Sequence, residues 1–114
     1  AASGVKYYIE VANMPTTNDA LDYLRAQKHM IVAPSKAVNA GGVAVSGLEM
    51  SQNSMRYSWS FEEVDAKLHD IMRSIFKACD NASKEYGMPG NYMAGANIAG
   101  FIKIAEAMKA QGNV

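Results

Sequence analysis

The sequence predicts an α/β fold with about two parallel strands joined through a helix and followed by three further helices. Two short runs of β-branched, aromatic and apolar residues, at 5–11 and 30–33, are typical of strands. A short helical pattern lies between them, and a strand–helix–strand unit predicts parallel strands with a right-handed crossover. From residue 45 onward, apolar residues recur at helical spacing, which predicts the three further helices.

The first strand is expected over Val5–Val11 and ends before Pro15, because proline cannot continue a strand or a helix through that point. Thr16 or Thr17 suits the N-cap of the next helix, since a threonine hydroxyl accepts a hydrogen bond from the first turn. We expect this short helix to end near Gln27.

The second strand is expected over Met30–Ala33 and ends at Pro34. Gly41 and Gly42 then lie before a helical pattern that runs from Val45 to about Tyr57. Paired glycines allow a turn with positive φ and a close approach to another surface. The free N–H groups at the start of the following helix would suit an anion or a polar ligand.

Two short polar side chains, Asn39 and Ser46, flank this predicted helix start and can form hydrogen bonds. Open α/β sheets bind their ligands at the carboxyl ends of the strands. The segment after the second strand is therefore predicted to face a ligand.

The longest helix begins with a capping box at Ser60 and Glu63 and ends at Gly87. Its apolar stripe contains Phe61, Val64, Leu68, Ile71, Met72, Ile75, Cys79, Ala82 and Tyr86. The last helix is expected over Ala94–Ala110 and is closed by Gly112. Gly95 and Gly100 weaken this helix, so we expect them to serve close packing against a neighbour.

Composition excludes several classes of function. Eleven basic residues balance eleven acidic ones, so the chain lacks the basic surface of a nucleic-acid binder, and no apolar run is long enough to span a bilayer. Cys79 is the single cysteine and is expected to pack in the core, which fits a reducing, cytoplasmic compartment. His29 and His69 lack partners at metal-ligand spacing, so no metal site is predicted.

Two features suggest part of a larger protein. The chain begins Ala1-Ala2-Ser3-Gly4, without an initiator methionine, and enters a strand at once. Two parallel strands need cover on both faces and lateral partners, and the glycine fingerprint that binds a dinucleotide phosphate is missing. Exposed strand edges favour pairing between chains, so we expect this chain alone to form a dimer or a higher oligomer.

Three separated blocks carry a resemblance to a known family: Ala12-Asn13-Met14-Pro15-Thr16-Thr17, the segment 33–53 around Val38-Asn39-Ala40-Gly41-Gly42-Val43-Ala44-Val45-Ser46, and Ala94-Gly95-Ala96-Asn97-Ile98-Ala99-Gly100-Phe101. In this order they resemble glutamate dehydrogenase of the hexameric bacterial type, within the glutamate/leucine/phenylalanine/valine dehydrogenases. The match covers nearly the whole chain but only the C-terminal part of such an enzyme.

The resemblance implies a fold and a reaction. The family has a substrate domain and a Rossmann-type domain, with a terminal helix that returns to the first. On that basis, 1–58 is the C-terminal part of a Rossmann-like nucleotide-binding domain, and 59–114 is a C-terminal helical segment. The implied reaction is the reversible oxidative deamination of L-glutamate to 2-oxoglutarate and ammonia, with hydride passing to NAD or NADP.

The resemblance also implies site residues. Asn13 and Asn39 would lie near the nicotinamide end of the cofactor. Ser46 would donate a hydrogen bond to the side-chain carboxylate of glutamate, and Val43 would pack on the methylene groups of the substrate. The catalytic lysine and aspartate of the family belong to its substrate domain, so no catalytic residue is predicted here and the chain alone should be inactive.

Two other functions remain open from the residues alone: a free-standing helical interaction module and a non-catalytic nucleotide-binding domain. The resemblance favours an oxidoreductase whose full-length form is a cytoplasmic homo-oligomer, a hexamer in this family. No nucleic-acid or membrane partner is expected.

Overall fold

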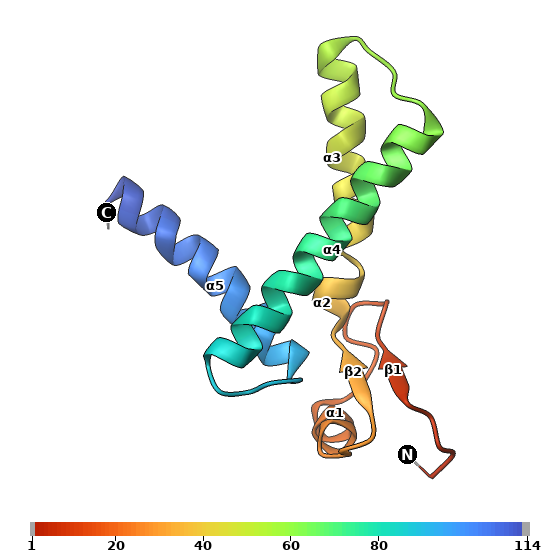
Figure 1. Ribbon diagram of the computed structural model, residues 1–114, viewed down its shortest axis with the longest axis vertical. Helices are drawn as coiled ribbons and strands as arrows, with labels where there is room; N and C mark the ends of the chain where they lie inside the picture. The colour runs from red at the N-terminus through yellow and green to blue at the C-terminus, as the bar shows by residue number, and fades with distance from the viewer. Residues whose placement is uncertain (1, 113–114) are drawn as a thin grey trace.

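The computed structural model describes residues 2–112. The elements are β1 (Tyr7–Ile9), α1 (Asn18–Arg25), β2 (Ile31–Ala33), α2 (Ser35–Val38), α3 (Ala40–Met55), α4 (Phe61–Glu85) and α5 (Tyr92–Gln111). Figure 1 shows the two strands and α1 at one end of the molecule, α3 alongside α4, and α5 diverging from α4 toward the C-terminus. The mixed α/β class and the two parallel strands are confirmed, and α2 is a short helix that the sequence did not predict.

Both strands are shorter than predicted, because only three residues of each strand, Tyr7–Ile9 and Ile31–Ala33, pair with the other. Tyr8 lies opposite Val32 in the parallel register. The ladder extends by one hydrogen bond at each end: Ile31 N donates to Lys6 O at 2.8 Å, and Glu10 N donates to Ala33 O at 3.1 Å. Pro34 follows β2 and has no N–H to donate, so the pairing stops there.

The core lies on one face of the sheet. Leu21, Met30 and Val32 are buried together, with Tyr8, Leu24 and Met93 packed against them. The N-cap of α1 is Thr17, whose hydroxyl accepts from Ala20 N at 3.4 Å. Period-two alternation sends Tyr7, Ile9 and Ile31 to the other face, where 46–62% of each residue is exposed.

The predicted turn at Gly41 and Gly42 is wrong. Both glycines lie inside α3, and neither has a positive φ. A Cβ added at Gly41 would meet Met72 Sδ at 3.4 Å and Leu68 Cδ1 at 3.6 Å, whereas one at Gly42 would meet nothing within 4 Å. Gly41 therefore lies at the contact between α3 and α4, where an added Cβ would make only ordinary contacts, and not in a turn.

The long helix has the predicted start and end. Ser60 Oγ accepts from Glu63 N at 3.2 Å, and Glu63 Oε2 accepts from Ser60 N at 2.7 Å, which completes the capping box. After α4, Gly87 adopts φ 76°, a left-handed conformation that closes the helix. Gly112 follows α5 at its predicted place.

The two glycines of α5 differ. A Cβ at Gly95 would lie 2.1 Å from Cys79 O and 3.2 Å from Ser83 Cβ, so Gly95 permits the close crossing of α4 and α5. A Cβ at Gly100 would meet nothing within 4 Å. The packing prediction is confirmed for Gly95, whereas no described residue packs against Gly100 and the prediction there stays a prediction.

The chain is open in shape for its length. Its radius of gyration is 16.9 Å, whereas a compact domain of this length would have about 13 Å. Large apolar side chains lie exposed on α3, α4 and α5, including Val43, Phe61, Phe76 and Phe101. No helix in the described part of the chain has the length and apolar character needed to cross a membrane.

Candidate functional site

The candidate site lies at the carboxyl ends of the two strands, where Asn13 and Asn39 meet. Asn13 belongs to the loop after β1, and Asn39 occupies the N-cap position of α3. The side chain of Asn39 makes no capping bond to its helix. Its Nδ2 instead donates to Asn13 Oδ1 at 2.7 Å. The two predicted cofactor residues, 26 positions apart, are thus brought into direct contact.

Val43 and Ser46 continue from Asn39 along one face of α3. Their spacing of four and then three residues places all three on the same side of the helix. Val43 is 78% exposed, and Ser46 is exposed with its hydroxyl donating to Gly42 O at 3.2 Å. The opposite side of α3 holds Gly41 against α4. Val43 and Ser46 are therefore exposed on the same side of α3 as the partly exposed Asn39, which contacts Asn13.

The predicted anion-binding helix start is not present. Asn39 has φ −82° and ψ −2°, so the chain passes from α2 into α3 in helical conformation. Asn39 N donates to Ser35 O at 2.8 Å, and Gly42 N donates to Asn39 O at 3.3 Å. The N–H groups of Asn39 and Gly42 are therefore taken by preceding carbonyls and are not free to bind an anion.

A cavity of about 560 Å³ lies at the same end of the molecule, and the loop that carries Asn13 forms part of its wall. Its polar lining includes Glu10, Thr16, Ser35 and Lys36. Glu10 is only 4% exposed, and none of the described residues forms a hydrogen bond with its Oε1. The sequence analysis missed Glu10, although period-two alternation from Tyr8 already places it on the buried face of the sheet.

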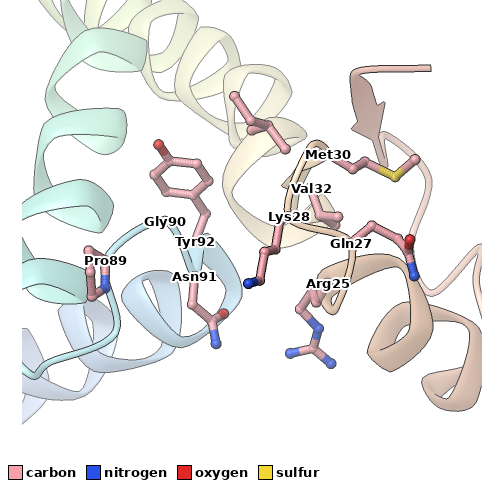
Figure 2. Close-up of a pocket in the computed structure, with 10 residues that line it drawn as sticks. Arg25, Gln27, Lys28, Met30, Val32, Pro89, Gly90, Asn91 and Tyr92 are labelled. Carbon is pink, nitrogen blue, oxygen red and sulfur yellow. The ribbon is translucent and has the colours of Figure 1, made fainter. Parts of the chain in front are cut away.

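A second cavity, of about 430 Å³, lies at the opposite end of β2 and contains none of the predicted site residues. Figure 2 shows the polar ends of Arg25, Lys28 and Asn91 converging on its opening. Two of these groups already have partners: Arg25 binds Asp22 Oδ1 at 2.6 Å, and Asn91 Oδ1 caps α5 by accepting from Ala94 N. Both bonds are local, because the first lies within α1 and the second caps α5.

The remaining candidate residues play structural roles. Cys79 is buried where α4 meets α5, and burial raises the pKa of its thiol above the ordinary value, so it is a packing residue as predicted. His69 Nε2 lies 3.6 Å from Asp65 Oδ2 on the exposed side of α4. Within residues 2–112, no three His, Cys, Asp or Glu side chains gather in a way that could hold a metal ion.

The sequence pattern of the glutamate/leucine/phenylalanine/valine dehydrogenases matches residues 1–112. The chain is 65% identical over 111 residues to the NAD-specific glutamate dehydrogenase of Clostridium symbiosum. This match covers 97% of this chain and 25% of that protein. It is 57% identical over 111 residues to the NADP-specific glutamate dehydrogenase of Giardia intestinalis, covering 97% of this chain and 24% of that protein.

Solved structures agree with the sequence comparison. One glutamate dehydrogenase structure, 65% identical, superposes with a TM-score of 0.93 over 97% of this chain and 25% of its own. The glutamate dehydrogenase of Peptoniphilus asaccharolyticus, which is 29% identical, superposes with a TM-score of 0.85 over 96% of this chain and 27% of its own. The chain spans about a quarter of the length of these relatives. With this sequence match and this fold, the chain belongs to the glutamate/leucine/phenylalanine/valine dehydrogenase family.

Proposed function

We propose that this chain is part of a glutamate dehydrogenase, which interconverts L-glutamate with 2-oxoglutarate and ammonia and passes hydride to NAD or NADP. Relatives named for each of the two cofactors match the chain, so the proposal includes both. Residues 1–58 belong to the nucleotide-binding domain, and 59–114 form the C-terminal helical segment. The observation that supports this assignment best is the contact of Asn39 with Asn13 at the head of the face that carries Val43 and Ser46.

The two asparagines suit the amide of a nicotinamide ring. Each side-chain amide offers two N–H donors and one carbonyl acceptor. Asn39 gives one hydrogen to Asn13 and keeps a second, while the Asn13 amide keeps both of its own. A bound nicotinamide would supply the hydride acceptor or donor of the reaction. The role of Asn13 and Asn39 is to bind its carboxamide and orient the ring.

Val43 and Ser46 suit a substrate with an aliphatic stem and a carboxylate end. The exposed Val43 side chain can pack on the two methylene groups of glutamate. The Ser46 hydroxyl, now bonded to Gly42 O, can rotate to donate to the side-chain carboxylate. These residues hold the reacting carbon against the nicotinamide and transfer no protons. The proton-transferring groups belong to another part of the enzyme, so this chain alone is inactive.

Replacing Asn39 with Ala tests the cofactor half of this proposal. In the full-length enzyme, the dissociation constant for reduced cofactor, followed by its fluorescence, should rise about five- to tenfold, because one neutral hydrogen bond and the support of Asn13 are lost. Glutamate affinity should change less. Asn53→Ala is the matched control, because Asn53 is an exposed asparagine near the other end of α3. Equal effects of the two substitutions on cofactor binding would contradict the proposal.

The full-length enzyme is proposed to be a cytoplasmic homo-oligomer, a hexamer as in the hexameric bacterial type. The open shape and exposed apolar residues of this chain support association with further protein. Alone, the chain is expected to form a dimer or a higher oligomer.

A further inference from the structure

Met14, in the loop between β1 and α1, has an unusual backbone conformation. Its φ is 49°, in the left-handed region that a residue with a Cβ atom rarely adopts. Pro15 follows it, and the residue before a proline is normally extended, with φ of about −120°. Met14 departs from both preferences, so its conformation costs free energy that other contacts must offset.

Arg56 is the other non-glycine residue of the described chain with a positive φ, and its conformation has a local explanation. It is the C-cap of α3, with φ 51°, and its N–H donates to Asn53 O at 3.2 Å. A left-handed residue is a common way to end a helix. Met14 lies in the loop that leads from β1 to α1 and ends no helix. Its left-handed conformation therefore needs a different cause.

Neither side-chain packing nor backbone hydrogen bonding supplies that cause. Met14 is 90% exposed, so packing of its side chain does not fix its backbone in the described chain. Within residues 2–112, the loop segment 11–16 forms no backbone–backbone hydrogen bond. The conformation of this loop therefore depends on its side chains.

Two side-chain hydrogen bonds hold the loop, one on each side of Met14. After it, Thr16 Oγ1 lies 2.8 Å from Tyr8 OH, which ties the loop to β1. Before it, Asn13 Oδ1 accepts from Asn39 Nδ2 at 2.7 Å, which ties the loop to the start of α3. The left-handed residue thus lies between the two anchors of the loop.

The backbone rotation at Met14 sets the direction of Asn13 relative to the anchored Thr16. Pro15 contributes little freedom, because its ring fixes its own φ at about −65°. With an extended φ at Met14, the chain would leave the turn in another direction and carry Asn13 away from Asn39. The left-handed conformation is therefore the one in which both anchors form together.

We infer that Met14 is a positioning residue, whose left-handed backbone turns Asn13 toward Asn39 and holds this asparagine pair in place before the cofactor binds. The inference rests on the proposed function, in which the pair binds the nicotinamide carboxamide. Met14 acts through Asn13 and takes no part in hydride or proton transfer. A site ordered in advance binds more tightly, because less freedom is lost on binding.

The test compares Met14→Val with Met14→Gly in the full-length enzyme. Valine is branched at Cβ and strongly disfavours a positive φ, whereas glycine adopts it readily. In Met14→Val, the dissociation constant for reduced cofactor, followed by its fluorescence, should rise about five- to tenfold, because the bond between the asparagines is lost. The KM for glutamate should change less. Met14→Gly should bind cofactor as the native enzyme does and melt at a higher temperature, because the backbone strain is relieved.

Combining Met14→Val with Asn39→Ala shows whether Met14 acts through the asparagine pair. The double variant should bind cofactor within about twofold of Asn39→Ala alone, because the contact that Met14 supports is already absent. Losses that multiply would contradict the inference, since Met14 would then act independently of Asn39. A loss in Met14→Gly as large as that in Met14→Val would also contradict it, because the side chain and not the backbone would be responsible.

Arg56→Val is the matched control for backbone strain alone. It places valine at the second left-handed position, at the end of α3 away from Asn39. This variant should melt at a lower temperature yet bind cofactor as the native enzyme does. Equal losses of cofactor binding in Arg56→Val and Met14→Val would overturn the inference, because general destabilisation would explain both.

The same titrations separate the two ways in which this account can fail. If Asn39→Ala weakens cofactor binding and Met14→Val does not, the inference about Met14 is wrong and the proposed function stands. If Asn39→Ala leaves cofactor binding unchanged, the proposed function is wrong and the inference about Met14 is wrong with it.

Discussion

Replacing Gly95 with Ala is expected to destabilise the protein by about 3 kcal/mol, the upper end of the usual cost of overpacking. The added Cβ would lie 2.1 Å from the backbone carbonyl oxygen of Cys79 and 3.2 Å from Ser83 Cβ. Because the nearest atom belongs to the backbone of α4, no side-chain rotation relieves the clash. The two helices must move apart, which exposes the buried Cys79 and Ala82.

Gly100→Ala is the matched control for this prediction. It is the same substitution in the same helix, five residues further on, at a site where no atom of residues 2–112 lies within 4 Å of the added methyl group. Alanine is favoured over glycine in a helix interior by about 1 kcal/mol, so this variant should be more stable than the native protein. Thermal unfolding followed by circular dichroism measures both. If the two variants shift the melting temperature by the same amount in the same direction, the close crossing of α4 and α5 is contradicted.

Replacing Ser46 with Ala is expected to weaken glutamate binding about ten- to a hundredfold in the full-length enzyme. The hydroxyl would donate to a carboxylate, and hydrogen bonds to charged groups are worth about 1.5–3 kcal/mol. Cofactor binding should change little, because Ser46 lies two turns from Asn39. The ratio of kcat/KM for glutamate between native and variant enzyme measures this loss.

Ser51→Ala provides the control on the same helix. Both serines are exposed, and both hydroxyls donate to the carbonyl four residues earlier: Ser46 to Gly42 at 3.2 Å and Ser51 to Gly47 at 2.9 Å. The two substitutions therefore remove the same local bond. Ser51 lies five positions beyond Ser46 and so faces a different direction. If both variants lose glutamate binding equally, the effect comes from the helix and Ser46 is not a substrate ligand.

Local signals in the sequence predicted the structure well wherever neighbouring residues determine the conformation. The capping box of Ser60 and Glu63, the N-cap at Thr17 and the helix end at Gly87 all depend on hydrogen bonds or φ angles within a few positions. The parallel pairing of the strands followed from the helix between them. The structure shows a contact between Asn13 and Asn39, whereas the ligands of all four site residues remain proposals.

The failures have tertiary causes. Gly41 and Gly42 were expected in a turn because a glycine pair is common there, but α4 packs against Gly41 and the helix runs through both. Gly95 and Gly100 look alike in sequence, and only their distance to α4 separates them. Glu10 reads as an ordinary strand-end residue until its burial is known. These distinctions depend on which surfaces meet.

A crystal structure of the full-length enzyme with reduced cofactor and glutamate is the most direct test of the central claim. The account predicts that the nicotinamide carboxamide lies within about 3.2 Å of an amide of Asn13 or Asn39 and that Ser46 Oγ lies within about 3.0 Å of the substrate side-chain carboxylate. A complex in which both ligands bind away from the α3 face, with Val43 and Ser46 still exposed to solvent, would contradict it.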